Sequence, residues 1–288
     1  MMDYNQLYNR IKAKQSFLCV GLDPDMSLIP VHLKELEFPL FEFNKAIIDA
    51  TAQYAVAFKL NLAFYECEGL KGWIQFEMTA NYIRNNYPAQ FLIADAKRGD
   101  IGNTAKKYAA AFFEHNDFDA VTIAPYMGRD SVEPFLDYKG KWAIVLALTS
   151  NKSSSDFETL EISGENNPLY KEVIKKTMEW GSKENIMFVC GATQAEKLTE
   201  IRDICPDNFL LVPGVGAQGG SVEQVSAYGM NSRCGLLINA SRSVIFAYKD
   251  KKTGDNTGIN FSKDAAEAAD FLASEMKCAL IKRGVILQ

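Results

Sequence analysis

The sequence has 288 residues, of which 48% are hydrophobic and 23% are charged, so it contains enough apolar material for a large buried core. The net charge of −5 argues against nucleic acid or an anionic membrane as a partner. The sequence has no apolar stretch of membrane-spanning length, and its polar amino terminus is unlike a signal peptide, so a cytoplasmic protein is expected.

Eight short apolar runs alternate with segments of helical length and periodicity. In chain order, the expected strands are Phe17–Leu22, Ala55–Leu60, Phe91–Ala94, Ala120–Ala124, Trp142–Leu148, Ile186–Cys190, Phe209–Val212 and Gly235–Ile238. The intervening helical segments include Phe41–Tyr54, Gly69–Asn86, Asn103–Asn116 and Pro168–Gly181. Most runs are apolar throughout, as in parallel strands that are covered on both faces. This alternation predicts an α/β protein with a (β/α)₈ TIM barrel.

The alternative architecture is a doubly wound open sheet, which more often has a glycine-rich nucleotide turn after its first strand. Here that strand ends in GLDPD (residues 21–25), a loop with carboxylates. We therefore expect one TIM-barrel domain over residues 1–288, with loop insertions near 151–167 and 249–260. The first insertion is either a mobile lid or a disordered loop. A final helix from Ser262 to about Lys282 should close the barrel.

Cysteine and histidine are poorly placed for a metal site. The six cysteines are widely spaced and form no C-x-x-C pair, and neither His32 nor His115 lies near a cysteine in the sequence. Zinc is therefore not expected. Acid–base chemistry must then fall to lysine, aspartate or glutamate.

The segment DAKRGDIGNT, from Asp95 to Thr104, follows the buried run Phe91–Ala94 and begins with four ionisable side chains in six positions. Side chains alternate in an extended strand, so Asp95 and Lys97 should point the same way. An ordinary surface ion pair is one interpretation. At the end of a buried strand, however, desolvation would penalise these charges unless they neutralise one another or bind a ligand, which indicates a functional site.

The carboxyl ends of the strands carry the chemistry in a TIM barrel. The other polar or glycine-rich positions expected there are Asp23, Lys59, Asn61, Pro125–Tyr126, Thr149–Ser150, residues 213–220 and Asn239–Arg242. The segment PGVGAQGG follows the seventh strand and Arg242 follows the eighth, where such barrels often bind phosphate through backbone N–H groups and a helix start. Turn glycines and a solvated arginine are the alternative for either feature alone.

Several motifs occur together at these strand ends. They are Asp-x-Lys-x-x-Asp-Ile-x-x-Thr, CVGLDPD, FKLN, PYMGRDS, PGVGAQGG and a Ser-Arg pair after the eighth strand. In this combination, from Phe17 to Val244, the sequence resembles the orotidine 5′-monophosphate decarboxylase family, in particular its longer bacterial form. The third-strand motif is shared with related sugar-phosphate barrels, but its combination with Gln218 and Arg242 is specific.

The resemblance implies decarboxylation of the nucleotide orotidine 5′-monophosphate to uridine 5′-monophosphate, the last step of de novo pyrimidine synthesis, without a metal or organic cofactor. Lys97 would stabilise and protonate the ring carbanion, and Asp95 would orient Lys97. Lys59 and Asp100 would complete an alternating set of charges. The family residues that match Asp100 and Thr104 enter from the partner subunit, so the resemblance also implies a homodimer with shared active sites.

The resemblance further implies a set of substrate-binding residues. Asp23, with Lys59, would bind ribose hydroxyls, and Ser150 would contact the pyrimidine, although the adjacent threonine leaves that register open by one residue. Gln218 and Arg242 would bind the phosphate. Ser241 would lie near the phosphate, at a position where the family more commonly has glycine.

Two other functions are compatible with these residues. The first is a magnesium-dependent barrel enzyme that acts on a ketose phosphate through an enediolate, with the same Asp-x-Lys-x-x-Asp group. The second is a phosphate-binding barrel without catalytic activity. The presence of the complete charged set, Lys59, Asp95, Lys97 and Asp100, argues against the second.

Overall fold

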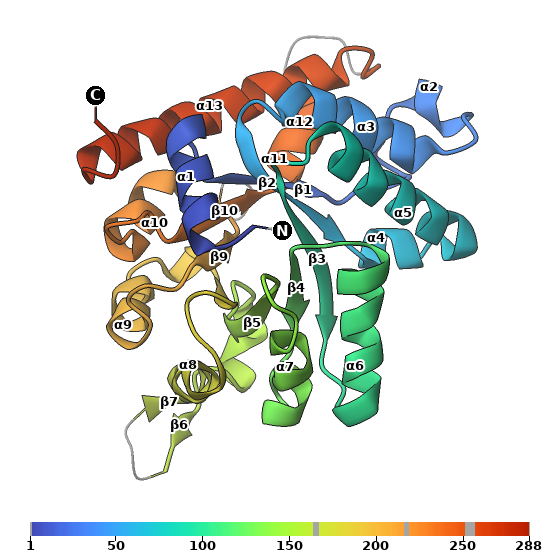
Figure 1. Cartoon of the computed structure of the whole chain (residues 1–288). Helices are drawn as coiled ribbons and strands as arrows, with labels where there is room; N and C mark the ends of the chain where they lie inside the picture. Colours follow the sequence, from blue (N-terminus) through green and yellow to red (C-terminus); the bar gives the residue numbers. More distant parts are fainter. Residues whose placement is uncertain (1, 164–166, 216–218, 251–256, 288) are drawn as a thin grey trace.

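A closed barrel of parallel strands forms the centre of the computed structural model (Figure 1). The structure describes residues 2–163, 167–215, 219–250 and 257–287. The strands of the barrel are β1 (Leu18–Leu22), β2 (Ala55–Asn61), β3 (Phe91–Arg98), β4 (Ala120–Ile123), β5 (Trp142–Leu148), β8 (Ile186–Cys190), β9 (Leu210–Pro213) and β10 (Leu236–Ala240). Their order around the barrel is β1-β10-β9-β8-β5-β4-β3-β2. The predicted (β/α)₈ architecture is therefore confirmed.

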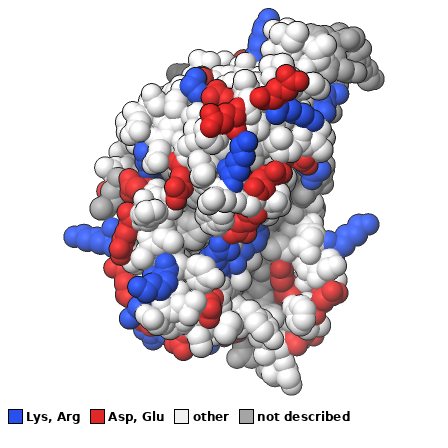
Figure 2. Space-filling view, turned by 90° about the vertical axis from the view of Figure 1, so that its right-hand side faces the viewer, with Lys and Arg blue, Asp and Glu red and all other residues white. Residues whose placement is uncertain are grey.

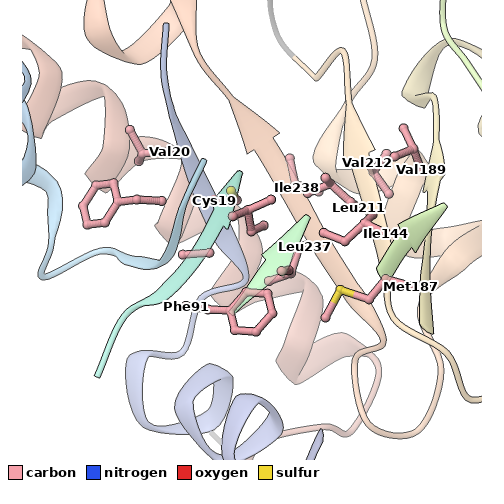
Figure 3. Close-up of a cluster of buried hydrophobic side chains, with 14 of the residues drawn as sticks. Cys19, Val20, Phe91, Ile144, Met187, Val189, Leu211, Val212, Leu237 and Ile238 are labelled. Carbon is pink, nitrogen blue, oxygen red and sulfur yellow. The ribbon is translucent and has the colours of Figure 1, made fainter. Parts of the chain in front are cut away.

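The barrel strands are almost entirely buried, which explains why they are apolar throughout. Figure 3 shows Phe91, Ile144, Met187 and Leu237 gathered from four different strands in one hydrophobic cluster. Each such side chain contributes about 1.5–3 kcal/mol of burial free energy. All four residues lie in the first half of their strands, before the carboxyl ends where the polar site residues are expected.

Helices follow most of the strands and cover the outside of the barrel (Figure 1). They are α1 (Tyr4–Lys14), α2 (Val31–Lys34), α3 (Pro39–Thr51), α4 (Ala63–Glu66), α5 (Gly69–Asn86), α6 (Gly102–Ala110), η1 (Ala111–His115), α7 (Arg129–Leu136), η2 (Lys152–Asp156), α8 (Leu169–Trp180), η3 (Ala192–Gln194), α9 (Lys197–Ile204), α10 (Val222–Gly229), α11 (Arg242–Ile245), α12 (Ala247–Asp250) and α13 (Phe261–Lys282). The expected final helix is α13.

The amino-terminal helix α1 packs against the amino ends of the barrel strands. Tyr4 stacks on Trp142, the first residue of β5, at a centroid distance of 6.5 Å, and it also contacts Phe209 just before β9. The Trp142 indole N–H donates to the Met2 carbonyl at 2.9 Å. One end of the barrel is thus covered by apolar and aromatic side chains, while the carboxyl ends of the strands lie at the opposite end.

The insertion expected to lack regular structure contains short elements instead. Besides η2, it holds a two-stranded antiparallel pair, β6 (Glu161–Ile162) and β7 (Asn167–Pro168), which projects from the barrel in Figure 1. The insertion folds back on itself, and a hydrogen bond from the Tyr170 N–H to the Glu158 carbonyl, at 2.8 Å, joins its two ends. In the second insertion, residues 251–256 lie outside the described part of the chain.

The face of the molecule seen in Figure 2 is mixed in charge. Figure 2 shows basic and acidic side chains interspersed over one face of the molecule, so this face has no extended basic area of the kind that binds nucleic acid. Among the helices that the structure describes, none has the length and hydropathy needed to cross a bilayer.

Candidate active site

A pocket of about 340 Å³ opens at the carboxyl ends of the barrel strands. Of the residues predicted to form the site, it is lined by Asp23, Lys59, Asp95, Lys97, Ser150, Ser241 and Arg242. These residues come from the ends of five different strands or from the loops that follow them. Parallel strands in a closed barrel all end at the same mouth, so residues far apart in the sequence meet there.

Four of these side chains form a linked set of opposite charges, which we call the charge array: Asp23, Lys59, Asp95 and Lys97. The Lys59 ammonium lies 2.9 Å from Asp95 Oδ2 and 3.5 Å from Asp23 Oδ1. The Lys97 ammonium lies 2.6 Å from Asp95 Oδ1. Asp95 therefore has one ammonium on each of its oxygens, and the array has two positive and two negative members.

The array keeps Asp95 and Lys59 charged despite their burial. Burial alone would raise the pKa of Asp95, but the positive charges of Lys59 and Lys97 outweigh it and hold the pKa well below its usual value. Burial alone would lower the pKa of Lys59, but Asp23 and Asp95 outweigh that effect and raise the pKa. Both groups are consequently ionised near neutral pH.

Lys97 reaches Asp95 from an unusual backbone conformation. Its φ of 47° lies in the left-handed region, where a residue other than glycine costs on the order of 1–3 kcal/mol. The register between β3 and β4 shifts between Ala94 and Arg98, as in a β-bulge that redirects a side chain. This bulge, rather than the simple strand alternation that we expected, brings the ammonium to Asp95. The Lys97 side chain remains 50% exposed, facing the open pocket.

Thr122 on β4 is a pocket residue that the sequence analysis did not single out. Its hydroxyl donates to Asp95 Oδ1 at 2.9 Å and accepts the Lys97 backbone N–H at 3.0 Å. The sequence signal was a single hydroxyl residue within an otherwise apolar strand. A β-branched threonine is common in strands, so this signal does not by itself indicate a site residue.

Asp100 and Thr104 are not brought to the pocket within one chain. Both are exposed, and neither lines the cavity. The Asp100 carboxylate accepts the N–H of Ile101 at 2.8 Å, just before α6 begins. Their proposed contribution therefore depends on a second copy of the chain.

The proposed phosphate end of the pocket is only partly described. Gln218 lies outside the described residues. Arg242 is exposed at the start of α11, which has four residues, so the helix dipole expected there is small. Asn239 donates to the Ser241 hydroxyl at 3.2 Å. A Cβ atom on Gly21 would come within 1.9 Å of that hydroxyl, so glycine in β1 is needed for this close packing.

Thr149 and Ser150 follow β5, and each lies close to another segment of the chain. The carboxylate of Glu158, in the insertion, accepts the Thr149 N–H at 2.7 Å and its hydroxyl at 2.7 Å. The Thr149 side chain is therefore already bound by protein groups. A Cβ atom on Gly191 would lie 2.7 Å from the Ser150 nitrogen, so glycine lets the residue after β8 approach Ser150 closely. Glu158 was also missed in the sequence, because it lies in a polar loop.

A closed (β/α)₈ barrel with linked ammonium and carboxylate groups at the carboxyl ends of its strands defines an α/β-barrel enzyme. Comparison with known proteins identifies its family. The chain belongs to the orotidine 5′-phosphate decarboxylase / HUMPS family, whose family model matches residues 16–256.

Individual relatives cover nearly the whole chain. The orotidine 5′-phosphate decarboxylase of Phocaeicola vulgatus is 56% identical over 277 residues, which are 96% of this chain and 98% of that protein. The enzyme of Bacteroides fragilis is 56% identical over 280 residues, which are 97% of this chain and all of that protein. The solved OMP decarboxylase structure from Leishmania donovani is 32% identical, with a TM-score of 0.79 over 96% of this chain and 99% of that one.

Proposed function

We propose that this protein decarboxylates orotidine 5′-phosphate (OMP) to uridine 5′-phosphate (UMP) in pyrimidine synthesis, without a cofactor, and that Lys97 stabilises and protonates the ring carbanion. Family membership supports the reaction. The observation that supports the role of Lys97 is its ammonium, 2.6 Å from the ionised Asp95 and facing the pocket.

The chemistry explains why a positive charge is needed at this point. Loss of carbon dioxide leaves an electron pair in the plane of the pyrimidine ring, where the π system cannot delocalise it. A preorganised ammonium stabilises that charge and then donates a proton to the same carbon. Asp95 holds Lys97 in place, and its negative charge faces the carboxylate that leaves. Lys59 balances Asp95 from the other side.

The remaining pocket residues fit the rest of the nucleotide. Asp23 Oδ1 is buried and forms an ion pair with Lys59 at 3.5 Å, but it accepts no hydrogen bond from the described residues, so a ribose hydroxyl would satisfy it. Ser150 would contact the pyrimidine. Gln218, Ser241 and Arg242 would bind the phosphate at the far end, with Arg242 able to make a bidentate contact.

Replacing Arg242 with alanine is expected to lower kcat/KM for OMP by about 10²–10³-fold, because a bidentate charge-assisted contact to phosphate is lost. Steady-state kinetics with the purified variant would measure this. Arg233→Ala, an exposed arginine that contacts Asn5, is the matched control and should behave like wild type. An unchanged kcat/KM in Arg242→Ala would refute the phosphate role.

We also propose a homodimer with shared active sites. Asp100 and Thr104 are exposed beside the pocket strand β3. Large apolar side chains are also exposed after β3, at Ile101 (42%), and after β4, at Tyr126 (87%) and Met127 (53%). Such a surface is typical of an interface. In this arrangement Asp100 of each chain would enter the pocket of the other chain and extend the charge array.

Mixing two inactive variants tests the shared site. Lys97→Ala and Asp100→Ala should each be inactive alone. In a mixed dimer one pocket is intact, because it combines Lys97 of one chain with Asp100 of the other. After subunit exchange about half of the dimers are mixed, so about a quarter of wild-type activity should return. A mixture that stays inactive despite demonstrated exchange would contradict the proposal.

The reaction itself is tested by adding OMP to the purified protein in the presence of a strong chelator. We expect loss of the ultraviolet absorbance of OMP at the same rate with and without chelator. A magnesium-stabilised enediolate mechanism, the alternative within this barrel type, would stop when the metal is removed. Absence of any absorbance change, or inhibition by the chelator, would refute the proposed function.

A further inference from the structure

The Thr122 hydroxyl lies between the backbone of Lys97 and the carboxylate that holds the Lys97 ammonium. Thr122 is 1% exposed and lines the pocket. Its oxygen accepts the Lys97 N–H at 3.0 Å, and its single proton goes to Asp95 Oδ1 at 2.9 Å. The Lys97 ammonium donates to the same Oδ1 at 2.6 Å. These contacts form a closed ring, in which the Thr122 hydroxyl binds the Lys97 backbone directly and is linked to the Lys97 ammonium through Asp95.

This ring coincides with the unusual backbone of Lys97. A lysine at a φ of 47° persists only where the surrounding contacts hold it there. The register shift between Ala94 and Arg98 interrupts the regular ladder between β3 and β4, which leaves a backbone donor to be satisfied. The Thr122 hydroxyl is the acceptor that satisfies it.

The bulge has a second support that does not involve Thr122. The Ala124 N–H donates to the Arg98 carbonyl at 2.7 Å, and the Arg98 guanidinium donates to Glu66 at 2.8 Å. Loss of the Thr122 hydroxyl should therefore loosen Lys97 without removing the bulge. Because the bulge has this independent support, the effect of the Thr122 hydroxyl on Lys97 can be tested without removing the bulge.

We propose that Thr122 is a positioning residue: by holding the Lys97 N–H and Asp95 Oδ1 together, its hydroxyl fixes the Lys97 ammonium where the ring carbon of the substrate is protonated. The proposal rests on the proposed function, because it takes Lys97 as the proton donor. Thr122 acts through Lys97 and not through the ribose or the phosphate. Its hydroxyl should therefore matter for turnover and little for nucleotide binding.

Two substitutions isolate the hydroxyl. Thr122→Val keeps the volume and the β-branch but removes the hydroxyl, and it should lower kcat by about 10²-fold, since a displacement of about 1 Å has such an effect on a positioned group. The dissociation constant of UMP should stay within about threefold, because the groups that bind the nucleotide are retained. Thr122→Ser restores the hydroxyl and should recover kcat to within about fivefold of wild type.

Thr177→Val is the matched control. Thr177 is a buried threonine on α8, outside the pocket, whose hydroxyl donates to the Val173 carbonyl at 2.7 Å. The same chemical change there removes a buried hydroxyl without touching Lys97. Its kcat and UMP affinity should equal those of wild type.

Amide hydrogen exchange gives a readout that needs no turnover. The peptide that contains Lys97 should exchange faster in Thr122→Val, and at the wild-type rate in Thr122→Ser and Thr177→Val. Equal exchange in all four proteins would overturn the proposal. A kcat of Thr122→Val within about threefold of wild type, or a parallel loss of kcat and UMP affinity, would overturn it too. A wild-type protein that fails to decarboxylate OMP would instead refute the proposed function, and the exchange comparison would still decide whether Thr122 holds Lys97.

Discussion

Replacing Lys97 with alanine is expected to lower kcat/KM for OMP by about 10⁵-fold. A positioned general acid contributes about 10²–10⁴-fold, and a preorganised charge near a developing anion contributes about 10²–10³-fold. In the proposed mechanism Lys97 supplies both. The fold should persist, because the Lys97 side chain is 50% exposed and Asp95 keeps Lys59 as a partner. A continuous ultraviolet assay at high enzyme concentration would measure the remaining rate.

The matched control is Lys71→Ala, which removes an exposed lysine on α5 outside the pocket and should leave kcat/KM unchanged. UMP affinity and the oligomeric state of Lys97→Ala should match those of wild type, which shows that the protein is intact. Activity above about 1% of wild type in Lys97→Ala would mean that another group protonates the ring.

The strands were predictable because burial on both faces leaves each of them an uninterrupted apolar run. The expected strand Ile186–Cys190 and the expected helix Gly69–Asn86 coincide with β8 and α5. Once the barrel was predicted, the polar residues after the runs had to meet at one mouth. This is why the sequence alone predicts that Asp23, Lys59 and Asp95 share one pocket, as the distances between them confirm.

The details that orient Lys97 could not be predicted, because they depend on the register between strands. The positive φ of Lys97 follows from the shift between β3 and β4, and no local residue type in the sequence indicates it. Thr122 could not be identified for the same reason, since its partners lie on another strand. Glu158 reaches Thr149 only because the insertion folds back on β5. Each of these contacts is long-range or bulge-dependent.

Replacing Asp95 with asparagine is expected to lower kcat by about 10³-fold, because the asparagine keeps the shape but not the charge that orients two ammonium groups. Lys59 and Lys97 would then repel each other across a neutral side chain, since both lie within 3 Å of the carboxylate in the native protein. Steady-state kinetics would measure the loss. Asp49→Asn is the control, because that carboxylate pairs with Lys45 outside the pocket and its loss should leave kcat unchanged.

Binding of OMP and UMP to Asp95→Asn separates two effects of the Asp95 carboxylate, namely repulsion of the substrate carboxylate and orientation of Lys97. The pKa of Asp95 is held well below its usual value by its two lysine neighbours, so the group is negative when the substrate carboxylate approaches. UMP lacks that carboxylate. If the charges repel, removing the charge of Asp95 should strengthen OMP binding relative to UMP binding, while kcat falls. Titration with UMP and single-turnover kinetics with OMP give the two dissociation constants. An unchanged ratio would show that Asp95 acts only by orienting Lys97, and Thr122 would then support the same single function, because it donates to the carboxylate oxygen that Lys97 also contacts.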